Sequence, residues 1–115
     1  MSVERRKFNR VPFEKPIRVK AIGGAQGSRY GDALARDISE GGIRFFHDHF
    51  IATTSRVLLE MTFPEADKPV VAVAKPVWVR ELSNRSQFEV GNAFLEIADE
   101  DKQVIRSFVQ RKRIP

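Results

Sequence analysis

The sequence predicts a mainly β fold, a six-stranded antiparallel β-barrel followed by a C-terminal α-helix, and three observations lead to this prediction. The chain has 115 residues, 42% of them hydrophobic, which suits one compact domain. Its body alternates apolar and polar residues with the period of half-buried strands, and its last segment changes to a helical period. Short clusters rich in Gly, Pro, Ser and Asn separate the alternating segments, as tight turns require.

Six segments are predicted to be strands. They cover residues 15–22, 29–36, 42–47, 56–63, 70–82 and 88–97. The fourth alternates well, and its inward face consists of Val57, Leu59, Met61 and Phe63. In the fifth, Pro76 lacks the N–H group that a strand ladder needs, so it requires an edge position or a β-bulge.

The first two strands form a predicted hairpin. The inward face of its first strand consists of Ile17, Val19 and Ala21. A turn centred near Ala25 and Gln26 pairs positions whose numbers sum to about 51, which places Lys15 opposite Arg36. The segments before the first strand and after the second therefore emerge at the same end of the barrel.

The helix is predicted over about residues 99–112. Its apolar face consists of Val104, Ile105, Phe108 and Val109. Acidic residues open the segment and basic residues close it, as the helix dipole favours. Asp99 or Asp101 is expected to cap the N-terminus.

Positive charge is concentrated at both ends of the chain, whose formal net charge is +5. Residues 1–20 carry seven bases against two acids, and residues 102–115 carry five bases and no acid. The 81 residues between them carry eight bases against thirteen acids. This asymmetry points to an anionic partner such as a nucleotide, a nucleic acid or a membrane surface, although two solvated tails would give the same distribution.

Composition excludes several other classes. The chain has no cysteine, so a disulfide framework and a thiolate metal cluster are ruled out. No apolar run is long enough to span a membrane and no signal peptide is visible, so a cytoplasmic location is the default expectation. No catalytic constellation is found, and the pair His47 and His49 lacks further ligands, so we expect neither an enzyme, nor a cofactor, nor a metal site.

Two clusters carry the functional signal. The first is a basic run before the first strand, in which Arg6 and Arg10 are four residues apart. Guanidinium groups fit phosphate and the O6/N7 edge of guanine, and they stack on bases. We interpret residues 1–11 as a flexible basic arm and residues 12–115 as the barrel domain with its helix.

The second cluster, Asp37 to Gly42, connects the second and third strands. Asp, Ser and paired Gly form tight turns, and a tight connection alone would account for them. A carboxylate also accepts hydrogen bonds from the N1–H and N2–H₂ edge of guanine. Because the hairpin brings both clusters to one end of the barrel, a ligand with phosphates and guanine edges would satisfy both.

Together the clusters resemble the PilZ domain family. Arg6 to Arg10 match RxxxR and Asp37 to Gly42 match [D/N]xSxxG, in this order and on a predicted six-stranded barrel. Val77–Arg80 and Val90–Phe94 are also similar to strand patterns of the family. The resemblance covers nearly the whole chain. It implies a PilZ-like split barrel that acts as a bacterial receptor for cyclic di-GMP, a ring of two guanosines and two phosphates.

The resemblance also implies site residues. Arg6 and Arg10 would clamp guanine edges and phosphates, and Asp37 would accept from a guanine N–H edge. Ser39 would form a hydrogen bond nearby, and Gly42 would let the backbone approach the ligand.

Two further residues extend this implied site. Arg5, directly before RxxxR, is associated in the family with two intercalated ligand molecules. Trp78 resembles a barrel residue that lies against the ligand, although a core or half-buried aromatic explains it equally well. Ligand binding is expected to order the arm across the barrel and so to create a surface that a downstream effector protein reads.

Two alternatives stay open. A small nucleic-acid-binding barrel would share the basic ends, but it would display aromatic residues between bases on an exposed sheet face, whereas here most aromatics fall on the apolar side. A PilZ-fold adaptor would act through protein contacts without nucleotide. Some family members lose the arginines, and this chain keeps them.

Overall fold

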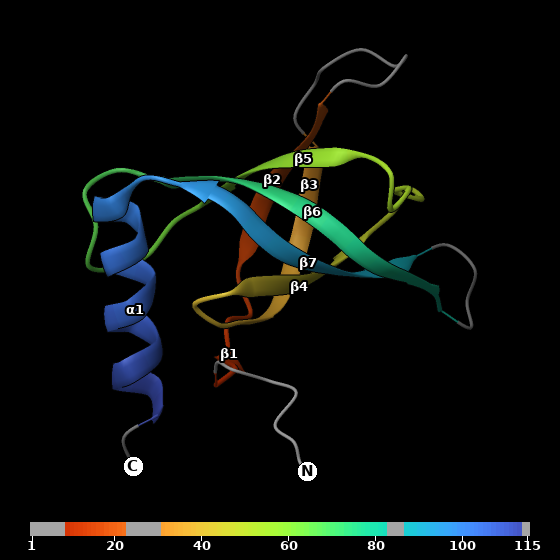
Figure 1. Cartoon of the computed structure of the whole chain (residues 1–115). Helices are drawn as coiled ribbons and strands as arrows, with labels where there is room; N and C mark the ends of the chain where they lie inside the picture. The colour runs from red at the N-terminus through yellow and green to blue at the C-terminus, as the bar shows by residue number, and fades with distance from the viewer. Residues whose placement is uncertain (1–8, 23–30, 83–86, 114–115) are drawn as a thin grey trace, which may run out of the picture.

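The computed structural model describes residues 9–22, 31–82 and 87–113 (Figure 1). These residues form seven strands and one helix. In chain order they are β1 (Val11–Pro12), β2 (Pro16–Ile22), β3 (Gly31–Ile38), β4 (Gly42–His47), β5 (Arg56–Met61), β6 (Val70–Glu81), β7 (Phe88–Ile97) and α1 (Asp99–Arg113). The six predicted strands and the helix are present, with bounds that differ from the prediction by at most two residues.

Six of the strands close into an antiparallel barrel. They are neighbours in the order β3, β2, β5, β6, β7 and β4, and pairing between β3 and β4 closes the ring. The short β1 pairs with β3 outside this ring, and α1 follows β7 (Figure 1). The predicted fold class is therefore confirmed.

Alternation along the strands builds the core as expected. The residues predicted to face inward are at most 1% exposed, three of them in β5 and the fourth two residues beyond its end: Val57, Leu59, Met61 and Phe63. In β2, Ile17 and Val19 are buried, but Ala21 is exposed. The described pairing of β2 with β3 ends at Val19. At Ala21, β2 pairs only with β5 among the described residues, so this residue is covered from one side only.

The predicted hairpin register is wrong by one residue. Ile17 pairs with Ala33, so the numbers of paired positions sum to 50, and the amide of Ala35 donates to the carbonyl of Lys15 at 2.9 Å. A one-residue slip would turn Asp32 and Arg36 toward the core, whereas the observed register turns small alanines there. The central turn lies outside the described residues.

Pro76 is accommodated by a β-bulge. Pro76 pairs with Asn92 and Trp78 pairs with Gly91, so one extra residue of β6 stands between them. Beyond Ala74, β6 has no described partner in β5, so this part of the strand is also an edge. The prediction that proline requires such a position is confirmed.

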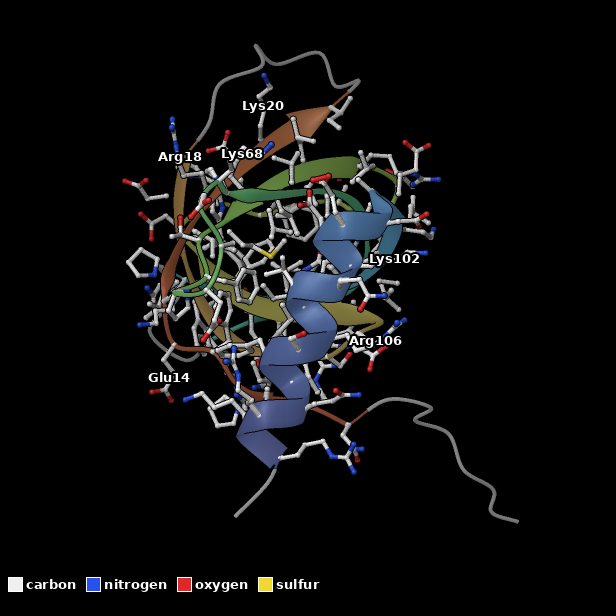
Figure 2. The ribbon with its side chains drawn as sticks, turned by 90° about the vertical axis from the view of Figure 1, so that its left-hand side faces the viewer. Glu14, Arg18, Lys20, Lys68, Lys102 and Arg106 are labelled. Atoms are coloured by element: carbon white, nitrogen blue, oxygen red, sulfur yellow. The ribbon has the colours of Figure 1, made fainter. Side chains whose placement is uncertain are left out.

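The helix α1 covers one side of the barrel (Figure 2). Ile105, Phe108 and Val109 are at most 5% exposed, and Val104 is partly buried against the same core. Lys102 donates its amide to the carbonyl of Ala98, while the carboxylate of Asp101 accepts the amide of Val71 at 3.3 Å. Asp101 therefore joins the helix to the start of β6. Among the described residues, no helix has the length and hydrophobicity to cross a membrane.

The strand β1 is absent from the prediction because two residues show no alternation. Val11 is 4% exposed and pairs with Ile38, so regular structure begins at the last residue of the expected arm. Residues 1–8 of that arm lie outside the described residues. Phe13, just after β1, stacks on Phe63 with ring centroids 4.8 Å apart and meets Phe108 edge-on at 5.4 Å. This aromatic cluster fixes the chain next to Arg10.

We expect Phe13→Ala to lower the free energy of unfolding by about 3–5 kcal/mol, because it opens a cavity between two other buried rings. Phe50→Ala is the matched control, since Phe50 is 64% exposed, and it should cost less than about 1 kcal/mol. Urea denaturation of both variants measures the difference. Equal losses would contradict the described core.

Candidate functional site

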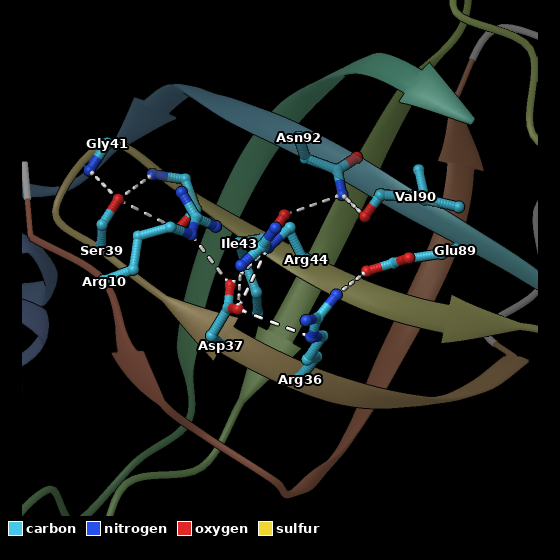
Figure 3. Close-up of polar contacts among 11 residues, drawn as sticks. Arg10, Arg36, Asp37, Ser39, Gly41, Ile43, Arg44, Glu89, Val90 and Asn92 are labelled. Carbon is cyan, nitrogen blue, oxygen red and sulfur yellow. Dashed lines mark hydrogen bonds and ion pairs between the residues drawn. The ribbon is translucent and has the colours of Figure 1, made fainter. Parts of the chain in front are cut away.

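The carboxylate of Asp37 is the centre of the site (Figure 3). Asp37 lies near the end of β3 and pairs with Arg44 of β4, next to an irregularity in the ladder. Arg44 donates through Nε to Oδ1 at 2.8 Å and to Oδ2 at 3.0 Å, and a second nitrogen of Arg44 also bonds Oδ2. Arg10 donates through Nε to Oδ1 at 2.9 Å. Both oxygens of Asp37 are thus held by arginines.

This arrangement keeps Asp37 ionised. Burial opposes ionisation, but hydrogen bonds from Arg44 and Arg10 outweigh it and lower the pKa of Asp37 below its ordinary value. The contact with Asp37 correspondingly raises the pKa of Arg44. A buried carboxylate with two guanidinium partners is a fixed anchor for both of them.

The Arg10–Asp37 contact brings the two predicted clusters together. The residues are 27 positions apart in sequence, yet their side chains are only 19% and 12% exposed where they meet. The predicted residues Arg5 and Arg6 lie outside the described residues. Of the RxxxR pattern, the structure therefore places its second arginine beside the acidic loop.

Ser39 and the glycines shape that loop. The hydroxyl oxygen of Ser39 accepts the amides of Gly41 at 3.1 Å and Gly42 at 3.2 Å (Figure 3), and the amide of Ser39 donates to the carbonyl of Gly42 at 2.8 Å. A Cβ atom on Gly42 would lie 2.0 Å from the carbonyl oxygen of Asn92. Gly42 is thus needed for the close approach of β4 to β7.

The loop is also tied to the helix. Arg106 of α1 donates through Nε to Glu40 at 3.0 Å. Glu40 lies directly between Ser39 and Gly41, so this ion pair fixes the middle of the loop from outside the barrel. The side chains of both partners stay partly exposed, so the ion pair contributes little to stability, and its main effect is to hold the loop in place.

Trp78 lies on the outer face of the same sheet. It pairs with Gly91, and a Cβ atom on Gly91 would lie 2.3 Å from Cε2 of the indole. The ring therefore rests on the bare backbone of β7, while the residue stays 39% exposed. Gly91 also pairs with Arg44, and Arg44 pairs with Asp37, so β7 and β4 lie between Trp78 on β6 and Asp37 on β3.

Sequence reasoning missed four charged residues of this face. Arg44 holds Asp37, and the buried Glu89 accepts hydrogen bonds from Arg36 and Arg80. Strand alternation places Arg44 and Glu89 outward, but it carries no sign of which neighbouring side chains fold over them. The sequence did carry one signal for Arg44. It lies two residues after Gly42 on the strand that starts at the loop, and residues two apart on a strand share a face.

The histidine pair lies at the end of β4 and just beyond it. The rings of His47 and His49 lie 5.7 Å apart, and the amide of His49 donates to Nδ1 of His47 at 3.2 Å. The part of the chain that the structure describes holds no group of three His, Cys, Asp or Glu side chains that could bind a metal ion.

Gly91→Ala should displace Trp78, because the new Cβ would overlap the indole. Trp78 is the only tryptophan in the sequence, so its fluorescence reports the displacement directly. We expect a red-shifted emission for Gly91→Ala, since the ring loses its cover. Gly31→Ala, whose Cβ meets no atom nearer than His47 Nε2 at 3.7 Å, should leave the emission unchanged. Unchanged emission in folded Gly91→Ala would refute the stacking on β7.

Solved structures share this fold. The inhibitor of motility MotI (DgrA) of Bacillus subtilis matches with a TM-score of 0.79 and 17% identity, over 97% of this chain and 53% of that one. The PilZ domain of YcgR from Escherichia coli with c-di-GMP matches with a TM-score of 0.66 and 10% identity, over 96% and 92% of the chains. The MrkH–c-di-GMP complex of K. pneumonia matches with a TM-score of 0.64 and 18% identity, over 95% and 52%. The chain spans about half the length of MotI and MrkH.

Sequence comparison identifies the family. A comparison with curated proteins finds no match. The family model described as PilZ domain matches residues 4–111, which include both motif segments, all seven strands and most of α1. The resemblance inferred from RxxxR and [D/N]xSxxG is thus confirmed, and the chain belongs to the PilZ domain family.

Proposed function

We propose that this chain is a receptor for cyclic di-GMP. The observation that carries the proposal is the contact between Arg10 and Asp37. It places a guanidinium, a group suited to phosphate and to guanine, beside the segment Asp37 to Gly42. Membership of the PilZ domain family supports it, as do the structural neighbours YcgR and MrkH, which were solved with c-di-GMP. The proposed activity is binding, not catalysis.

In this proposal Arg10 binds the ligand through its terminal nitrogens. Its Nε group is engaged by Asp37, and a guanidinium carries four further N–H groups on its two terminal nitrogens. These groups suit a phosphate or the O6/N7 edge of guanine. Arg6 is proposed to act with Arg10, and Arg5 to bind a second, intercalated ligand molecule.

Asp37 has two proposed roles. The sequence predicts that it accepts a hydrogen bond from a guanine N–H edge. Its contacts with Arg10 and Arg44 favour a second role, in which it orients the Arg10 guanidinium before the ligand arrives. A preoriented group loses less freedom on binding, so this role raises affinity without a direct ligand contact.

The remaining proposed site residues are Ser39, Gly42 and Trp78. Ser39 and Gly42 shape the loop, and Trp78 offers one ring face for a guanine to stack on. The sequence predicts that the ligand orders residues 1–11, but Arg10 and Val11 already contact Asp37 and Ile38. Ordering of the residues before them, and recognition of the resulting surface by an effector protein, stay predictions of the sequence. They rest on the arginines at its N-terminus.

Titration calorimetry with cyclic di-GMP, GTP and single-stranded DNA tests the proposal. We expect the parent chain to prefer cyclic di-GMP, and Arg6→Ala with Arg10→Ala to weaken its binding by more than about tenfold, because each bidentate arginine contact is worth ~1–3 kcal/mol. Arg56→Ala with Lys68→Ala removes the same charge and is the control.

Three results would contradict the proposal. One is unchanged affinity in the folded Arg6 and Arg10 variant, which would exclude these arginines. Another is tighter binding of single-stranded DNA than of cyclic di-GMP, which would favour the nucleic-acid-binding alternative. The third is no binding of any of the three ligands, which would favour the adaptor that acts through protein contacts.

A further inference from the structure

A second buried carboxylate lies on the outer face of the barrel, beside the site described above. Glu89 of β7 has a side chain that is only 1% exposed, and each of its oxygens is held by a different arginine. Arg36 of β3 bonds Oε2 (Figure 3), and Arg80 of β6 bonds Oε1. The two arginines themselves stay 45% and 64% exposed. They therefore cover the carboxylate and face solvent.

The balance of charge on this face is positive. Burial opposes ionisation of Glu89, but hydrogen bonds from Arg36 and Arg80 outweigh it and lower the pKa of Glu89. Nε of Arg36 also lies 3.8 Å from Oδ2 of Asp37, so both carboxylates belong to one network. This network consists of four arginines and two carboxylates: Arg10, Arg36, Arg44, Arg80, Asp37 and Glu89. Its four arginines against two carboxylates leave a formal excess of two positive charges.

Arg36 and Arg80 have donors to spare. A guanidinium carries five N–H groups, and the described contacts of each with Glu89 use one nitrogen. A buried anchor restricts the rotation of both side chains, so less freedom is lost when an anion binds. Solvent-facing, preoriented guanidinium groups are the usual partners of phosphate.

An aromatic surface adjoins the two arginines. Trp78 stands two residues before Arg80 on β6 and covers Gly91, which pairs with Arg44. An exposed ring beside arginines matches a molecule that combines a planar base with phosphate. An inorganic anion would use the arginines alone.

We propose that Arg36 and Arg80, held by Glu89, form an anion-binding subsite for a phosphate group of the nucleotide whose base stacks on Trp78. This inference rests on the proposed function and extends its site to residues outside both motifs. The alternative is that the two arginines serve only to neutralise Glu89.

The test uses a triple variant that leaves no buried charge unpaired: Arg36→Gln, Arg80→Gln and Glu89→Gln. The matched control is Arg18→Gln, Glu60→Gln and Lys68→Gln. It also removes two cations and one anion: the ion pair between Arg18 and Glu60, 3.9 Å apart on β2 and β5, and the exposed Lys68. Calorimetry measures cyclic di-GMP affinity. The NMR signals of arginine Nε–H groups are followed in the parent chain during titration with cyclic di-GMP and with inorganic pyrophosphate.

We expect the triple variant to bind cyclic di-GMP roughly tenfold more weakly than the parent, and the control to stay within about twofold. Equal affinity of the triple variant and the parent would overturn the subsite and leave the proposed function standing. If the parent fails to bind cyclic di-GMP but pyrophosphate shifts the Arg36 and Arg80 signals, the anion site stands and the proposed ligand is wrong. No binding and no shift with either probe would overturn both.

Discussion

The buried carboxylate of Asp37 joins three parts of the chain. An unpaired charge at 12% exposure would be costly, and here Arg44 of β4 and Arg10, just before β1, neutralise it together. The contact ties the end of β3 to β4 and to the segment that carries RxxxR. The proposed role of Arg10 depends on this contact, because it determines where the guanidinium of Arg10 lies.

Two residues of the [D/N]xSxxG motif have structural roles that do not require a ligand. The hydroxyl of Ser39 is engaged by two loop amides, and the missing Cβ of Gly42 makes room for the carbonyl of Asn92. Gly91 makes comparable room for the ring of Trp78. The glycines therefore set how closely β4, β7 and the ring of Trp78 pack, and in the proposed function the charged groups beside them recognise the ligand.

The architecture and one pair of site residues could be predicted because local patterns determine them. The alternation of Val57 to Met61 settles which face of β5 is inward, and the hairpin brings Arg10 close to Asp37 even with its register wrong by one residue. The register could not be predicted because turn position alone does not show that alanines face the core. The burial of Glu89 depends on two arginines from other strands, which no local pattern reveals.

A double-mutant cycle on cyclic di-GMP affinity tests most directly whether Asp37 acts through Arg10. The cycle compares Asp37→Asn in the parent chain with the same change in an Arg10→Ala background. If Asp37 orients Arg10, the substitution weakens binding in the parent and has almost no effect once Arg10 is gone, a coupling of about 1 kcal/mol or more. Equal losses in both backgrounds would contradict this account and would assign Asp37 to direct recognition of guanine.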